Sequence, residues 1–246
     1  MRCIELKQVV TIIVAGMFSL AVNACSMSPE QEAAAIERGI LESPGAEVLW
    51  ATIKEEYPQD FAELIARVQA LDNAERFNEQ KTKEVGAQWL QDFFARITPD
   101  AVKAPQEELL TWSATEAELY QTLQRNAPAE CAAMTMGQWV FIDESNRLAT
   151  AAIARRNAAM VRASAAGLQN PQEYGQPSEA EFNRLGDSIS ATGIAPELQA
   201  LLGSDAAMAA LPPDQQCELG VAVFVGLSTL PDDVEPQMVA YMLAPG

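Results

Sequence analysis

The sequence contains no histidine among its 246 residues. Histidine is the commonest general base near neutral pH and the commonest protein ligand of zinc, so its absence removes both roles. It also excludes the Ser-His-Asp and Cys-His arrangements of nucleophilic catalysis. The four cysteines are too few and too widely spaced for a four-thiolate zinc site. We therefore expect no metal site, and the only catalytic groups left are carboxylates.

Glycine is missing from the patterns that bind nucleotides. None of the 13 glycines is followed two residues later by another glycine, and none immediately precedes a lysine. The dinucleotide fingerprint and the P-loop both require such pairs. A calcium loop of the Asp-x-Asp-x-Asp-Gly type is also absent. These absences predict a protein that uses no nucleotide and no other cofactor.

Basic residues are scarce, with 16 Lys and Arg against 34 Asp and Glu, which gives a formal net charge of −18. None lies after Arg184, where eight carboxylates follow. Because nucleic-acid binding needs Lys and Arg to neutralise phosphates, we expect no nucleic-acid partner. An anionic membrane surface would repel this domain as well. The acidity either steers a basic protein partner towards the chain or keeps an exported protein soluble.

The amino-terminal 25 residues resemble a bacterial signal peptide. A positively charged start precedes an apolar run at 9–22, whose 14 residues are fewer than the roughly 20 that a transmembrane helix needs. The run ends in Val-Asn-Ala-Cys at 22–25, which resembles a lipobox with an unusual Asn23 in the middle. The resemblance implies that Cys25 becomes the first mature residue and carries diacylglycerol. The alternative is ordinary cleavage after Ala24, with Cys25 a free or disulfide-bonded thiol.

The export signal sets the expected organisation of the chain. We predict a signal peptide at 1–24, a lipid-anchored tether at 25–45 and a single α-helical domain at 46–246. The only membrane contact would come from the lipid on Cys25. This places the protein in the cell envelope, facing the periplasm; the alternative is a soluble periplasmic or secreted protein.

Two cysteines remain once Cys3 leaves with the signal peptide and Cys25 is lipidated. Cys131 and Cys217 lie 86 residues apart, and an even pair in an oxidising compartment predicts a disulfide. Closing a loop of that length stabilises the fold by roughly 4 to 5 kcal/mol at most in the chain-entropy model. The alternative is a pair of buried free thiols that pack as small apolar residues.

Apolar residues recur at helical spacing along most of the chain, and strand patterns are nearly absent, which predicts an all-α fold. We expect an irregular multi-helix bundle of about eight to ten helices. Only the stretch 134–142 reads as extended. The predicted helices lie at 29–41, 44–57, 61–71, 74–97, 105–126, 146–168, 182–189, 213–230 and 235–243, with a short one starting at Pro196.

Two segments 70 residues apart share the pattern helix, proline, acidic, apolar, helix. Pro58 precedes Phe61 in the first, and Pro128 precedes Cys131 in the second. The pattern predicts two related helical hairpins, which would put Cys131 at a buried position equivalent to Phe61. The alternative is chance, because any bent pair of helices gives this pattern.

An acidic pair, Asp143 and Glu144, follows an apolar segment and precedes Ser145. The Glu-Ser dipeptide resembles the catalytic glutamate motif of lytic transglycosylases, which cleave peptidoglycan in the bacterial envelope. The resemblance implies that Glu144 is a general acid with a raised pKa. The Gly-Leu-Met-Gln type of segment that follows in that family is missing. The alternative is that both carboxylates lie in the first turn of a helix, where they complement its dipole.

Together these features predict an exported envelope lipoprotein with a non-catalytic binding or structural role, directed towards another protein. One alternative is a peptidoglycan-cleaving enzyme, similar to lytic transglycosylases, that uses Glu144 as its acid. The other is an acidic protective protein that inhibits a basic toxin. Such an inhibitor would expose an apolar patch rimmed with carboxylates.

Overall fold

The chain folds into helices joined by short turns, as the periodicity predicts. The computed structural model describes residues 28–71, 78–138, 140, 142 and 145–244, and within these ranges it contains twelve helices and no strand. The all-α class is confirmed. The helices are α1 (Pro29–Leu41), α2 (Glu47–Glu56), α3 (Pro58–Gln69), α5 (Glu79–Ala101), α6 (Gln106–Asn126), α7 (Pro128–Thr135), α8 (Arg147–Gln169), α9 (Glu179–Ala191), α10 (Pro196–Gln199), α11 (Asp205–Ala209), α12 (Pro213–Leu227) and α13 (Glu235–Leu243).

The count exceeds the predicted eight to ten because of two short helices. α7 has eight residues and α11 has five, which is too short for an apolar repeat to stand out in the sequence. The prediction that 134–142 is extended is wrong at its start, since Met134 and Thr135 form the last turn of α7. None of the helices in the described ranges is long and apolar enough to cross a membrane.

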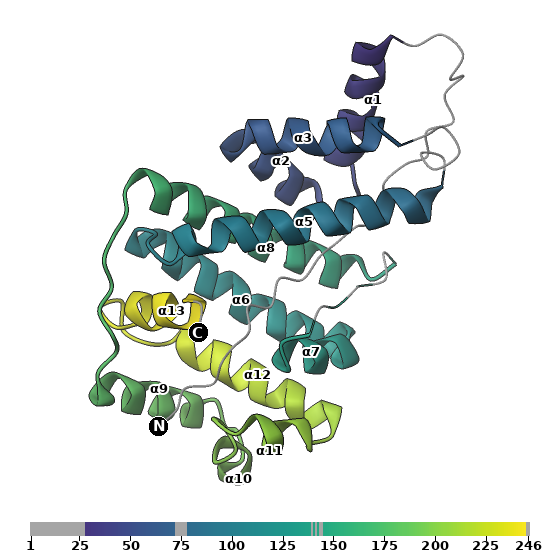
Figure 1. Cartoon of the computed structure of the whole chain (residues 1–246). Coiled ribbons are helices and arrows are strands. Elements are labelled where there is room, and N and C mark those ends of the chain that lie inside the picture. The colour runs from purple at the N-terminus through teal and green to yellow at the C-terminus, as the bar shows by residue number, and fades with distance from the viewer. Residues whose placement is uncertain (1–27, 72–77, 139, 141, 143–144, 245–246) are drawn as a thin grey trace.

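The helices stack in layers from one end of the molecule to the other (Figure 1). α1 and α3 form one end, and α2, α5 and α8 lie beneath them. α6 follows, in contact with α8 on one side and α12 on the other. α7 packs along α12, and α9, α10 and α11 form the opposite end. The larger hydrophobic core runs from α1 through the central helices to α12 and α13, and a smaller one lies between α9, α11 and α12.

α8 is the central helix, buried along most of its length against α2, α5 and α6. Its sequence is rich in alanine, and such small side chains let neighbouring helices approach closely. The closest approach is at Gly167, where an added Cβ would lie 2.0 Å from the Asp100 carbonyl oxygen of α5. Near it, the Ser164 hydroxyl of α8 donates a hydrogen bond of 2.7 Å to the Ile97 carbonyl oxygen.

Both proline hairpins bend in the same way. Tyr57 ends α2 and starts α3 at φ −132° and ψ 61°, and Ala127 joins α6 to α7 at φ −153° and ψ 62°. A residue before proline is displaced from the α region, so the bend follows from Pro58 and Pro128. Phe61 and Cys131 are both buried, as expected. The proline effect alone explains this likeness, so a common origin of the hairpins stays a prediction.

α1 packs onto the rest of the molecule although it lies within the predicted tether. A capping box between Ser28 and Gln31 starts the helix, and Pro29 occupies its first position. Ile36 and Ile40 are buried against the core, where α1 contacts α2 and α3. The part of the tether from residue 29 onward is therefore ordered. The division of the chain at residues 24 and 45 stays a prediction.

Two glycine-to-alanine substitutions on helices should have opposite effects on stability. We expect Gly167→Ala to lower the free energy of unfolding by about 2 kcal/mol or more, because the new methyl group collides with backbone. Gly186→Ala in α9 meets nothing within 4 Å and should raise it by roughly 0.5–1 kcal/mol. Urea unfolding of both variants measures the difference. A neutral Gly167→Ala would contradict the close packing of α8 on α5.

Candidate functional site

A buried ion pair joins the two helices at the centre of the fold. Arg156 of α8 donates from Nε to Oε2 of Glu116 on α6, and the two side chains are 4% and 2% exposed. α6 presents Glu116 on its apolar face, one turn after Trp112 and one turn before Tyr120. Among the ion pairs between described residues, this is the one in which both charged side chains are buried.

The Arg156 guanidinium has further partners that fix its position. Its Nη1 donates to Oδ1 of Asn157 at 3.0 Å, and its Cζ lies 5.5 Å from the centroid of the Trp112 ring. Asn157 is fully buried, and Trp112 is 3% exposed. A cation held over an aromatic face gains electrostatic energy when it is desolvated. The guanidinium is therefore held by a carboxylate, an amide and an aromatic ring.

Burial dominates the electrostatics of these groups. It raises the pKa of the Glu116 carboxyl, while the Arg156 charge and hydrogen bond oppose that rise. Burial also raises the pKa of the Tyr120 hydroxyl, and the nearby Glu116 charge adds to the effect. With so little exposure, neither member of the pair reaches a ligand in solution in this conformation. The cluster orients α6 against α8.

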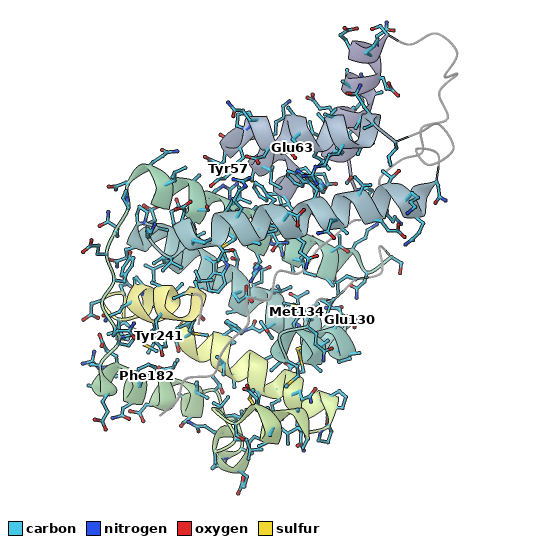
Figure 2. All side chains as sticks on the ribbon, in the orientation of Figure 1. Tyr57, Glu63, Glu130, Met134, Phe182 and Tyr241 are labelled. Atoms are coloured by element: carbon cyan, nitrogen blue, oxygen red, sulfur yellow. A yellow bond between two sulfur atoms is a disulfide. The ribbon has the colours of Figure 1, made fainter. Side chains whose placement is uncertain are left out.

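A second buried carboxylate lies at the start of α13. Glu235 is 5% exposed, and burial raises the pKa of its carboxyl, with the Asp232 charge raising it further. α13 contacts α6 and α5. Its Tyr241 meets Phe182 of α9 edge-on, with ring centroids 5.5 Å apart (Figure 2). α13 thus joins the carboxyl-terminal helices to the central layers.

Surface charge divides the molecule into two parts. Every ion pair between described residues uses a Lys or Arg from the range 54–156. The six exposed carboxylates after Arg184 have no Lys or Arg partner among the described residues. They are Asp187, Glu197, Asp205, Asp214, Asp232 and Asp233. The ion pairs are Lys54–Glu37, Arg67–Glu63, Arg67–Asp92, Lys81–Glu84, Arg96–Asp60, Lys103–Asp100, Arg155–Glu118 and Arg156–Glu116.

These carboxylates lie on α9–α13 and the turns between them, which we call the acidic end. α9, α10 and α11 are farthest from α1 (Figure 1), and Glu63, which is paired with Arg67, lies on α3 at the α1 side (Figure 2). Arg184 of α9 is the one basic residue of the acidic end, because no Lys or Arg follows it in the sequence. The acidic end is the part of the described surface best suited to attract a cationic partner.

The structure brings together one of the predicted pairs of site residues. Cys131 of α7 and Cys217 of α12 are buried with their Sγ atoms 2.00 Å apart, so the predicted pairing is confirmed at the level of distance. Glu144 and Cys25 lie outside the described residues, and their predicted roles stay predictions. Glu116 and Arg156 are not among the site residues predicted from the sequence. The sequence signal for this pair is Glu116, which lies at helical spacing between the apolar residues Trp112 and Tyr120.

No protein-family model matches the chain, and neither does any curated protein or solved structure. Among the residues that the structure describes, no group of three or more His, Cys, Asp and Glu side chains is arranged to hold a metal ion. The functional features on which a proposal can rest are therefore the buried pair, the cysteine pair and the acidic end.

Removal of one member of the buried pair should be strongly destabilising. We expect Glu116→Gln to lower the free energy of unfolding by about 3–5 kcal/mol, because it leaves the Arg156 charge buried without its counterion. Replacing both residues, as Glu116→Leu with Arg156→Met, should recover most of that loss. Chemical denaturation of the three proteins measures these values.

The exposed pair between the same two helices provides the control. Glu118 and Arg155 are 51% and 43% exposed and 2.6 Å apart, so Glu118→Gln should change stability by less than about 1 kcal/mol. Equal effects of Glu118→Gln and Glu116→Gln would show that burial of the central pair does not matter for stability.

The cysteine pair should be recovered as a disulfide from the native protein. Peptide mapping without reduction is expected to yield Cys131 and Cys217 in one linked species, because both are buried and adjacent. Cys131→Ser with Cys217→Ser should lower the free energy of unfolding by up to roughly 4 kcal/mol through loss of the loop constraint. Two thiols that alkylate freely in unreduced, unfolded protein would contradict the pairing.

Proposed function

We propose that the protein is an exported lipoprotein that binds a basic protein partner through its acidic end, without catalysing a reaction. The single observation that carries the proposal is the division of surface charge. Ion pairs engage eight carboxylates before Arg184, whereas none of the six exposed carboxylates after Arg184 has a Lys or Arg partner among the described residues.

Carboxylates without an ion-pair partner attract cations over distances longer than a direct contact. Their summed field reaches roughly 8–10 Å at physiological salt and raises the rate of encounter with a cationic surface. Charge complementarity of this kind governs association rate and specificity more than affinity. A partner of this protein should therefore be basic, and its binding should weaken as salt is added.

The arrangement of the termini supports a membrane anchor at Cys25. α1 begins at Pro29, four residues after Cys25, so an extended linker spans at most about 14 Å. α1 lies at the end of the molecule opposite α9–α11 (Figure 1). An anchor there would hold the acidic end away from anionic lipid headgroups, which would otherwise repel it.

Site-specific photo-crosslinking in living cells tests the proposal. A photoreactive residue replaces Glu197 at the acidic end or, as the control, the exposed Glu55 of α2, so both variants lose the same charge. We expect adducts at position 197 at least fivefold more abundant than at position 55, with a basic protein in the adduct. Cys25→Ser should abolish membrane recovery of the lipidated chain, which intact mass identifies.

Equal crosslinking at both positions, or adducts only with acidic proteins, would contradict a partner site at the acidic end. Release of muropeptides by the purified protein, abolished by Glu144→Gln, would instead support the enzyme alternative. A wild-type chain recovered wholly soluble at the mass of the unmodified mature protein would contradict the lipid anchor while leaving the partner site unaffected.

A further inference from the structure

The acidic end carries an apolar surface between α9 and α12. Residues 195–212, which we call the α10–α11 segment, consist largely of alanine and leucine and contain no basic residue. Only Met208 within this segment is buried. The leucines that pack against the small core beneath are all partly exposed: Leu198, Leu202 and Leu211.

The α10–α11 segment covers α12 incompletely. A cavity of about 30 Å³ is lined by Leu202 and Met208 of the segment, by residues of α12 that include Phe224, and by Tyr120 of α6 and Thr135 of α7. Well-packed interiors leave few voids as large as a water molecule. The segment is therefore loosely packed on α12, and Leu198, Leu202 and Leu211 each keep part of their surface exposed.

Three exposed carboxylates lie within the α10–α11 segment or directly after it in the sequence. Glu197 and Asp205 lie within the segment, and Asp214 begins the helix that follows it; all three are exposed. A second copy of this chain would bring the same negative charges together, and an anionic membrane would do likewise, so both are repelled. A partner that fits must present apolar side chains flanked by cations.

We propose that the α10–α11 segment and the exposed carboxylates Glu197, Asp205 and Asp214 bind a basic amphipathic helix of the partner. The apolar face of that helix packs on Leu198, Leu202 and Leu211, and its Lys and Arg side chains pair with Glu197, Asp205 and Asp214. Amphipathic helices are recognised in this way through the apolar anchors of one face. The inference rests on the proposed function and specifies the chemistry of the partner.

Two synthetic peptides of identical Leu and Lys composition test the inference. One places Leu on a single helical face, and the other has a scrambled order without such a face. Binding to the full chain in phosphatidylcholine nanodiscs is measured by fluorescence anisotropy, with the signal from empty nanodiscs subtracted. We expect the amphipathic peptide to bind at least tenfold more tightly than the scrambled one.

Two matched variants locate the binding surface. Ala209 of α11 and Ala66 of α3 are both exposed helical alanines, and Ala→Lys at either changes the net charge equally. Ala209→Lys should weaken binding of the amphipathic peptide at least fivefold, whereas Ala66→Lys should change it less than twofold. Circular dichroism of both variants confirms that each keeps the helical fold.

The outcomes separate this inference from the proposed function. Equal affinity for the two peptides, or equal weakening by the two variants, would overturn the inference and leave a basic partner that is recognised by charge alone. Absence of binding for both peptides at low salt would overturn the inference and count against the proposed function as well.

Discussion

The fold depends on burying α8 on nearly all sides. Alanine side chains are small and make few van der Waals contacts each. α8 therefore stabilises the molecule only if α2, α5 and α6 approach it closely. Its one large charged side chain in the interior, Arg156, must then find its counterion inside the core, and Glu116 of α6 supplies it. A buried pair contributes little net stability but penalises alternative registers, in which either charge would be left alone.

The uneven distribution of surface charge follows from the positions of the Lys and Arg residues that form ion pairs. Lys and Arg of the first layers hold α1–α3, α5, α6 and α8 together through ion pairs between and within helices. The acidic end instead is joined to the body by apolar contacts of the larger core, such as Phe224 stacked on Tyr120, and by the Cys131–Cys217 pair between α7 and α12. Its six exposed carboxylates have no Lys or Arg partner among the described residues, which leaves them available to a partner protein.

The sequence predicts the parts of this fold that repeat over many residues. Long helices such as α6 and α8 show their apolar period clearly. The pairing of Cys131 with Cys217 follows because two cysteines remain after processing and an exported protein enters an oxidising compartment. α7 and α11 are too short to show a period. The buried pair does not stand out in the sequence, because Arg156 directly follows Arg155, whose side chain is exposed. Adjacent helical residues point about 100° apart, so only Arg156 turns inward.

The central claim is that the acidic end is the surface that meets a basic partner. Hydrogen–deuterium exchange on the full chain, with and without the crosslinked partner protein added in purified form, tests it directly. The account predicts added protection confined to α9–α12 that disappears at high salt, because the encounter is electrostatic. Protection confined to α2, α3 and α5, or protection insensitive to salt, would contradict it.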